Sequence, residues 1–543
     1  MVCNCWQRGK SMTATDRKIL LLFVTVSLVL RLACLNLNSA EYTDGILQIT
    51  AFDYGFTFWP PVYTVAAKAV GLLVGNLEQA AKLISIVSST LLIVPLFWLT
   101  VRLAGRSAAI YASLFYMTNP IAARWSIRVM SDSLFALLFF WSAVLFLHIL
   151  ESKPGQETND GERKPARLPW AAFVAACLMA PLATLTRYQG ILLLPLEFLA
   201  LKAFLARRGG MDILPMNSHG QDARGTKNKF AITLMVVLPW LLALTWLGEH
   251  YAAHERQIVE RTGLSLAETL VSYWNLAESF LLFLPYFLTI PVFVLFIVGL
   301  GLFWGSAPSS GVEQMEPVVA RRSNPIRRTF GWSFLAFAAL ILAIQSVFGA
   351  FQERYLLPLV PFMMVFVGAA AARWEKNAGK RLAVVRTALV LVICYCFAWT
   401  SAVLILQREA FGDIKQAARY CATLPPQARI FSNEFYRPDM PAIKMSFWSG
   451  RRVEGFRGSE PLAKGDYLCL HSVYGDLNEQ IAEVRKRYDC KDVEWFEASI
   501  VPLLPDIMEI PGTHPNPLAW VFRYHRQRFR TVVLQIDGPR SAQ

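Results

Sequence analysis

An acidic residue stands just beyond the first long apolar run of this 543-residue chain. Asp44 belongs to the sequence Glu41-Tyr42-Thr43-Asp44-Gly45, where a membrane span would meet water. A carboxylate at that depth costs little free energy and can face a cavity that lipid enters from one side and water from the other. There it could take a proton from a hydroxyl group. Asp44 is therefore the first candidate for a catalytic residue, and a solvated loop acid is the alternative.

The composition predicts the elements that position this acid. The chain is 55% hydrophobic and 17% charged, with a mean hydropathy of +0.39, whereas soluble domains carry about 25% charged residues. Its apolar runs of roughly 17–25 residues can cross a bilayer core of about 30 Å. We expect a polytopic α-helical membrane protein with about eleven spans. They are Ile19–Leu37, Ala80–Val101, Ser107–Ala123, Ser133–Leu150, Leu168–Thr186, Gly190–Leu205, Phe230–Gly248, Phe280–Trp304, Gly331–Gly349, Tyr355–Ala372 and Arg386–Leu406.

Loop charges predict the orientation of these spans, because Lys and Arg collect in cytoplasmic loops. The basic clusters fall in every second loop: Arg8, Lys10, Arg17 and Lys18; Arg102 and Arg106; Lys153, Arg163, Lys164 and Arg167; Arg207, Arg208, Arg224, Lys227 and Lys229; Arg321, Arg322, Arg327 and Arg328; Arg373, Lys376, Lys380 and Arg381. We expect a multi-pass protein of the cell (inner) membrane with a cytoplasmic N-terminus and an uncleaved first span. The net charge of +14 then reflects topology, and no nucleic-acid partner is expected.

The opposite, extracytoplasmic face carries the remaining polar chemistry. Its first outer loop, residues 38–79, contains the apolar segment Val62–Val74, which is too short to span and is expected to lie in the membrane interface. The polar residues expected at this face are Glu41, Asp44, Asp53, Arg124, Arg128, Asp132, Arg187, Tyr188, Glu353 and Arg354. The positive-inside rule disfavours arginine here, so these arginines call for a reason beyond topology.

Residues 407–543 differ from residues 1–406, because they are rich in charge and proline and lack a run of span length. Expected helices are Phe411–Leu424 and Leu477–Tyr488, and expected strands are Arg429–Phe431, Tyr467–Leu470 and Thr531–Ile536. This pattern predicts a transmembrane domain followed by a small extracytoplasmic α/β domain. The basic run Arg523–Arg530 is interpreted as a solvated strand face or as a contact for anionic headgroups or glycans.

The nine cysteines do not form a regular disulfide framework. Cys421, Cys469 and Cys490 fall in the expected outer domain, where one pair could oxidise, but the spacing does not select the pair. The sequence contains no zinc-type spacing, no P-loop and no dinucleotide-binding glycine motif followed by an acid. No cofactor is expected, and a divalent metal has no ligand cluster to support it.

Several motifs together resemble the GT-C superfamily of integral membrane glycosyltransferases. The resemblance is greatest to the branch of the protein O-mannosyltransferases and the bacterial lipid A aminoarabinose transferases, and it covers roughly residues 19–406. The matching segments are Asp44-Gly45, Trp59-Pro60-Pro61-Val62-Tyr63, Thr186-Arg187-Tyr188-Gln189-Gly190 with Pro195, the run Arg354–Pro361, Arg31, and Arg128 with Ser131-Asp132. Their order along a matching topology carries the resemblance.

The resemblance implies an inverting transfer of a sugar from a polyprenyl-phosphate donor to an acceptor hydroxyl at the extracytoplasmic face. It makes Asp44 the general base. Its donor-phosphate ligands would be Arg354, Arg187, Arg128 and Arg31, and its acceptor-orienting residues would be Glu41, Asp53, Asp132 and Tyr188. The chain departs from the family in having Gly45 where an Asp-Glu pair is usual, and Arg187 where other members have lysine. The sugar, and whether the acceptor is protein, lipid or glycan, stay open.

A transporter or flippase of lipid-linked sugars is the alternative from another class, and a surface-polysaccharide polymerase or ligase would use the same chemistry. Transporters often contain internal repeats and broken helices with charges at the bilayer midplane. We find no convincing repeat between the two halves of the chain, and the middles of the expected spans lack acids. The sequence therefore favours the glycosyltransferase.

Overall fold

The computed structural model describes residues 12–53, 59–151, 170–209, 233–248, 266–304, 324–348, 352–434, 441–504 and 526–540. Several predictions fall on residues outside these ranges: the basic residues Arg8, Lys10, Lys153, Arg163, Lys164, Arg167, Arg224, Lys227, Lys229, Arg321 and Arg322, and the start of the run Arg523–Arg530. All of the expected site residues lie inside them.

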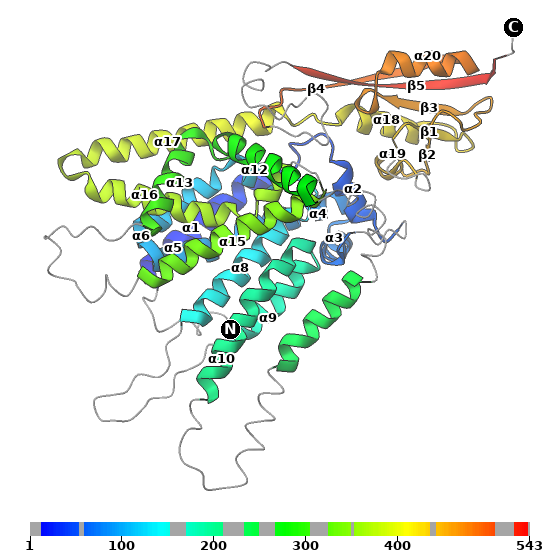
Figure 1. Cartoon of the computed structure of the whole chain (residues 1–543). Helices are drawn as coiled ribbons and strands as arrows, with labels where there is room; N and C mark the ends of the chain where they lie inside the picture. Colours follow the sequence, from blue (N-terminus) through cyan, green and yellow to red (C-terminus); the bar gives the residue numbers. More distant parts are fainter. Residues whose placement is uncertain are drawn as a thin grey trace, which may run out of the picture.

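The N-terminal three quarters of the chain form a bundle of helices (Figure 1). Its α-helices are α1 (Ala14–Ala33), α2 (Thr43–Thr50), α3 (Pro61–Val74), α4 (Leu77–Leu91), α5 (Ile93–Ala104), α6 (Arg106–Met117), α7 (Pro120–Ser126), α8 (Asp132–Glu151), α9 (Trp170–Thr184), α10 (Leu194–Gly209), the helix Thr233–Gly248, α12 (Leu266–Leu288), α13 (Ile290–Trp304), α15 (Asn324–Phe348), α16 (Val360–Asn377) and α17 (Leu382–Leu406). Three 3-10 helices join them: η2 (Tyr188–Leu193), η3 (Glu353–Leu356) and η4 (Gly379–Arg381).

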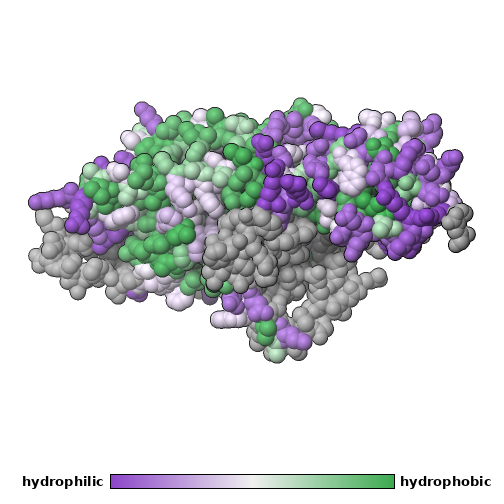
Figure 2. Space-filling view, turned by 90° about the horizontal axis from the view of Figure 1, so that it is seen from above, coloured by the Kyte–Doolittle hydropathy of each residue, from purple (hydrophilic) through white to green (hydrophobic). Residues whose placement is uncertain are grey.

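Four helical segments in the described ranges are long and apolar enough to cross a membrane. They are Leu77–Ala104, Asp132–Leu150, Tyr188–Leu205 and Gly379–Leu406. The bent pair α12 and α13 makes a fifth if it counts as one span. On the face seen in Figure 2, apolar side chains cover much of the bundle, whereas hydrophilic ones gather over the C-terminal part. These features agree with a multi-pass membrane protein, but the expected number of eleven spans is not confirmed.

Two expected spans are interrupted, and prolines explain both interruptions. The expected span Phe280–Trp304 is bent by 114° at Thr289, which has a φ of 71°. Pro285 and Pro291 flank that bend and cannot supply the backbone N–H that a continuous helix needs. In the expected span Ser107–Ala123, α6 stops at Met117, and Asn119-Pro120 starts the separate helix α7.

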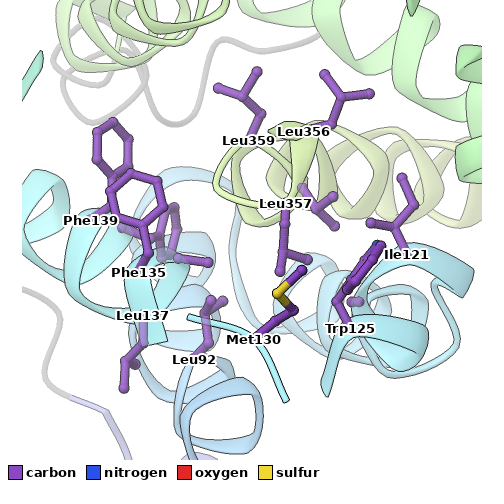
Figure 3. Close-up of a cluster of buried hydrophobic side chains, with 14 of the residues drawn as sticks. Leu92, Ile121, Trp125, Met130, Phe135, Leu137, Phe139, Leu356, Leu357 and Leu359 are labelled. Atoms are coloured by element: carbon purple, nitrogen blue, oxygen red, sulfur yellow. The ribbon is translucent and has the colours of Figure 1, made fainter. Parts of the chain in front are cut away.

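An apolar core lies between the elements that carry the polar candidates (Figure 3). Trp125 comes from α7, Met130 from the segment before α8, and Leu357 from the turn after η3, and all three are buried. They hold two segments without α-helix, residues 127–131 and 352–359, the second of which contains η3, against the bundle. Short irregular segments fixed by packing can present side chains in a defined geometry.

The C-terminal part contains a five-stranded sheet with helices, as the sequence predicted. Its elements are α18 (Gly412–Thr423), β1 (Ile430–Ser432), α19 (Ile443–Ser449), β2 (Glu454–Gly455), β3 (Tyr467–His471), η5 (Ser472–Tyr474), α20 (Leu477–Arg487), β4 (Tyr488–Ile500) and β5 (Gln527–Pro539). The strand order is β2-β1-β3-β5-β4, in which β1 is parallel to β2 and β3 while β5 is antiparallel to β3 and β4. Helix α20 lies over one face and α18 under the other (Figure 1).

The prediction missed α19, the two-residue strand β2 and the long strand β4. β4 reads Tyr488-Asp489-Cys490-Lys491-Asp492-Val493-Glu494-Trp495, which is too charged to look like a strand. It forms because β5 supplies a long antiparallel partner, an interaction that propensity does not describe.

Candidate active site

Asp44 lies in the first turn of α2, a helix that packs closely on the segment before α8. A side chain at Gly45 would not fit, because a Cβ there would come within 2.1 Å of the Val129 carbonyl oxygen. Glycine therefore lets the two backbones approach. The Asp44 side chain keeps 19% of its surface exposed, so it is reachable, whereas the following residues of α2, 45–50, are buried.

Arg354, from η3, pairs with Asp44. Its Nη2 donates to Asp44 Oδ2 at 2.5 Å, and its Nη1 contacts the Met130 sulfur at 3.3 Å. The guanidinium lies 5.5 Å from the ring centres of both Trp125 and Tyr355. With only 2% of its surface exposed, Arg354 is a buried cation held by one carboxylate and two aromatic faces.

A second ion pair shares the Tyr355 ring. Arg187, in the turn between α9 and η2, donates from Nη1 to Asp132 Oδ1 at 2.7 Å and lies 5.4 Å from the Tyr355 ring centre. Asp132, at the start of α8, is buried, and its Oδ2 has no hydrogen-bond partner within the described ranges. Tyr188 follows Arg187 and begins η2, half-buried. The structure thus brings two arginines to the Tyr355 ring, and each arginine pairs with one carboxylate, Arg354 with Asp44 and Arg187 with Asp132.

Arg124 and Glu353 form a buried pair beside this group. Glu353 Oε1 accepts from the Arg124 guanidinium and, at 3.2 Å, from Trp125 Nε1, while Arg124 also donates to the Tyr42 hydroxyl. Because Glu353 precedes Arg354 and Tyr42 precedes Thr43-Asp44, this pair fixes both sides of the Asp44–Arg354 contact. Sequence reasoning gave Arg124 no clear role and missed Glu353 as its partner.

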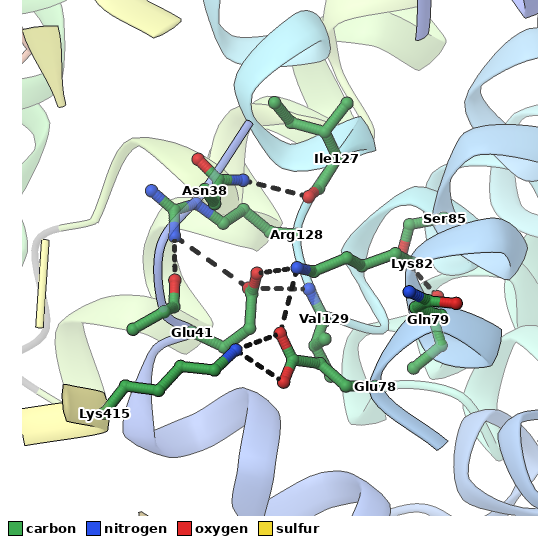
Figure 4. Close-up of polar contacts among 12 residues, drawn as sticks. Asn38, Glu41, Glu78, Gln79, Lys82, Ser85, Ile127, Arg128, Val129 and Lys415 are labelled. Carbon is green, nitrogen blue, oxygen red and sulfur yellow. Dashed lines mark hydrogen bonds and ion pairs between the residues drawn. The ribbon is translucent and has the colours of Figure 1, made fainter. Parts of the chain in front are cut away.

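A second charge network supports the segment that leads into α2 (Figure 4). Glu41 is fully buried; it forms an ion pair with Lys82 Nζ at 2.9 Å and accepts a hydrogen bond from the Val129 backbone N–H at 3.0 Å. Lys82 also pairs with Glu78 at 3.0 Å, and Lys415 of α18 donates to both Glu78 oxygens at 2.9 Å. The network therefore joins the C-terminal part to the loop that carries Asp44.

Arg128 belongs to this same support. It donates from Nη1 to the Ala40 carbonyl at 2.7 Å, lies 4.0 Å from Glu41 Oε2, and stacks over the Tyr42 ring at 5.0 Å. Sequence reasoning missed Lys82 and Glu78. A signal existed for Lys82, since a lysine within the apolar run of α4 needs a partner.

Two of the expected site residues have other neighbours. Arg31, in α1, donates to Ser27 and lies 5.9 Å from the Tyr116 ring centre. Asp53 is exposed and pairs with Lys68 at 2.5 Å. Within the described ranges no three His, Cys, Asp or Glu side chains gather as a metal site would require.

No family model matches this chain, and no curated protein matches it in sequence. Several solved structures, however, match its fold. ArnT from Cupriavidus metallidurans superposes with a TM-score of 0.54 in the apo state and 0.54 when bound to undecaprenyl phosphate, at 12% and 14% identity. Both alignments cover 96% of this chain and 98% of ArnT. The Archaeoglobus fulgidus oligosaccharyltransferase in complex with Zn and sulfate aligns at a TM-score of 0.49 and 11% identity, over 88% of this chain and 72% of that one. The chain thus has the GT-C fold, the fold of the lipid A aminoarabinose transferase ArnT.

Proposed function

We propose that this protein is a membrane glycosyltransferase that moves a sugar from a polyprenyl-phosphate donor to an acceptor hydroxyl at the extracytoplasmic face. The observation that carries the proposal is the contact between Asp44 and the buried Arg354, with Arg187 on the same Tyr355 ring. It puts one partly exposed carboxylate beside a buried cation, and a second cation contacts the same aromatic ring as the first. A base for a hydroxyl and positive charge for a leaving phosphate are the two requirements of this reaction.

Asp44 acts as the general base in this proposal. It takes the proton of the acceptor hydroxyl while the oxygen attacks the anomeric carbon. The bond from that carbon to the phosphate oxygen breaks in the same step, and the phosphate leaves with the electron pair. One displacement inverts the anomeric centre, so no second carboxylate is needed as a nucleophile. The departure from the Asp-Glu pair at Gly45 is compatible with this scheme, because Gly45 has a packing role.

Arg354 and Arg187 are the proposed phosphate ligands. A phosphate oxygen accepts a hydrogen bond more strongly than the Met130 thioether does, so an incoming donor would displace a weak contact at Arg354 Nη1. Sharing Arg354 with the phosphate would also loosen its hold on Asp44 and free that carboxylate to contact the acceptor hydroxyl. Asp132 would keep the Arg187 guanidinium oriented through its 2.7 Å bond.

Arg128 and Glu41 are better suited to positioning than to substrate contact, because backbone and side-chain groups of the protein already engage them. Arg31 and Asp53 contact other residues and take a secondary place in the proposal. The capture of undecaprenyl phosphate in an ArnT crystal supports the choice of donor class for a protein with this fold.

We place the N-terminus in the cytoplasm and the C-terminal part outside, with residues 1–406 and 407–543 as two domains. The basic residues Arg17, Lys18, Arg102 and Arg106 support this orientation, since they gather at one end of α1, α5 and α6. Asp44 and Lys415 then share the outer side, in agreement with the network that joins them.

The test is sugar transfer by the purified protein. Radiolabelled polyprenyl-phosphate sugars are offered one by one, and the consumption of each is followed. We expect one to be consumed and expect Asp44→Asn to lower the rate by about 10²–10⁴-fold, while Asp53→Asn retains most of it. A near-normal rate of sugar transfer by Asp44→Asn would refute the assignment of Asp44 as the general base. Movement of an intact donor across vesicles without consumption would favour the transporter.

A further inference from the structure

Two buried cysteines face each other in the C-terminal part. Cys421 lies in the last turn of α18 and Cys469 in the middle of β3, and both are fully buried. Their sulfur atoms are 3.4 Å apart although the residues are 48 positions apart in the chain. A disulfide requires the sulfurs to close to about 2.05 Å, with Cα atoms about 4.4–6.8 Å apart. The two sulfur atoms would have to approach by a further ~1.4 Å to form the bond.

The third cysteine of this part, Cys490, is excluded as a partner by the sheet. It lies in β4, and β5 stands between β4 and the β3 strand that carries Cys469. Two strand spacings amount to about 9–10 Å, beyond the roughly 7 Å limit for Cα atoms of a disulfide. Cys490 also packs on the α20 face, whereas Cys421 and Cys469 belong to the core on the α18 face.

We propose that Cys421 and Cys469 form a disulfide bond in the mature protein. The proposal rests on the extracytoplasmic location given under the proposed function, because disulfides persist in oxidising compartments. The two thiols lose two protons and two electrons as the sulfur–sulfur bond forms. A protein disulfide of the thiol–disulfide oxidoreductase class accepts them and is reduced to its dithiol. Oxidation occurs during folding, before the thiols are buried.

The bond would stabilise the docking of the C-terminal part on the bundle. It closes the chain from α18 to β3 and so fastens α18 to the sheet. The same helix carries Lys415, which holds both oxygens of Glu78 at the outer end of α4. Glu78 connects through Lys82 to Glu41, just before α2. The disulfide thus fixes the outermost member of the network that supports Asp44.

The direct test is a thiol map of the full-length protein. The protein is purified from its native membranes without reductant, alkylated with iodoacetamide in denaturant, and digested for mass spectrometry. We expect a linked peptide pair containing Cys421 and Cys469, with Cys490 alkylated. Alkylation of both Cys421 and Cys469 before any reductant is added would overturn the proposal. The readout needs no sugar transfer, so it fails or succeeds independently of the proposed reaction.

A second measurement follows unfolding of the C-terminal part. Cys421→Ala, Cys469→Ala and the double variant should each unfold roughly 5–15 °C lower than wild type, since each loses the same crosslink. Cys490→Ala is the matched control and should change little. Reductant should lower the unfolding temperature of the wild-type protein to that of the Cys421→Ala and Cys469→Ala variants. Additive losses in the double variant, with no effect of reductant on wild type, would show two separately packed thiols and refute the bond.

Discussion

Asp44 and Arg354 form the contact on which the proposed chemistry depends, and the two residues are 310 positions apart. Their partners decide what each can do. Arg354 is buried and contacts two aromatic rings, so packing fixes its side chain and the position of its charge. A fixed cation in a site with little water stabilises developing negative charge more than a solvated one does.

The phosphate role of Arg354 predicts unequal effects at the two ends of one helical segment. Arg354→Ala should reduce use of the lipid-phosphate donor about 10-fold or more, because charge-assisted contacts contribute roughly 1.5–3 kcal/mol. Arg373→Ala, at an exposed position near the other end of α16, should change it little. Arg354→Lys keeps the charge but loses the planar fork, so it should fall between them. Equal losses of donor use in Arg354→Ala and Arg373→Ala would mean that Arg354 only holds its helix at the membrane interface and does not bind the phosphate.

Among the elements, α2 and the segment before α8 depend on each other for position. Glu41 bonds the Val129 backbone N–H, and Gly45 touches the Val129 carbonyl. This segment also holds Met130, which contacts Arg354. A displacement of α2 would therefore move the base relative to the cation even if neither side chain changed.

Gly45→Ala tests this close approach. The added Cβ meets a backbone atom, which cannot swing away, so α2 has to shift. We expect a stability loss of about 1–3 kcal/mol, typical of overpacking, together with lower transfer activity. Gly71→Ala in α3 is the matched control, because its Cβ would make ordinary contact 3.6 Å from Leu77 Cδ1. Unfolding temperature in detergent and transfer rate measure both variants, and a Gly45→Ala protein as stable as Gly71→Ala would contradict the packing argument.

His471 of β3 gives the C-terminal sheet a defined response to acid. Its Nε2 bonds Ser432 and its Nδ1 bonds Thr531, whose hydroxyl donates to Asp413. Burial first, and then the nearby Lys444 ammonium, lower the pKa of His471 to about 3. The folded state thus holds the neutral ring, and the unfolded state takes up a proton below about pH 6.5.

Stability of this part should therefore fall as pH drops from about 6.5 toward 3. From pH 6.5 to pH 5 the loss of folding free energy from His471 alone should be about 1.6 kcal/mol. Burial raises the pKa values of Asp413 and Glu434, so these carboxyls act in the opposite direction, favouring the fold at lower pH. Denaturant unfolding at several pH values measures this. The free energy of unfolding should fall with pH in the wild-type protein and should depend less on pH in His471→Gln. Identical profiles would show that His471 titrates freely.

Across the whole molecule, the sequence predicted what depends on local composition. Apolar runs located most of the bundle helices, and the motif order predicted the GT-C fold. The partners of the site residues could not be predicted, because each pair joins distant segments: Arg124 with Glu353, Arg187 with Asp132, Lys415 with Glu78. Hydropathy says where an arginine lies along a span but not which carboxylate compensates it. The prediction of one straight span over Phe280–Trp304 missed the bend at Thr289. Its cause is local, because Pro285 and Pro291 on either side of the bend are visible in the sequence.

The orientation of the chain is the last property to test at this scale. Ion pairs through Lys82 and Glu78 connect Glu41, which precedes Asp44, directly with Lys415 of α18, so we expect Asp44 and the C-terminal sheet to lie on one side of the membrane. A phosphatase fused after Gln543 should therefore be active outside the cell membrane, and a reporter that needs the cytoplasm should be silent there. An odd number of spans gives this result when the N-terminus is cytoplasmic, whereas ten or twelve spans would reverse it. The reverse pattern would put the proposed base on the cytoplasmic side, and it would overturn the site assignment together with the topology.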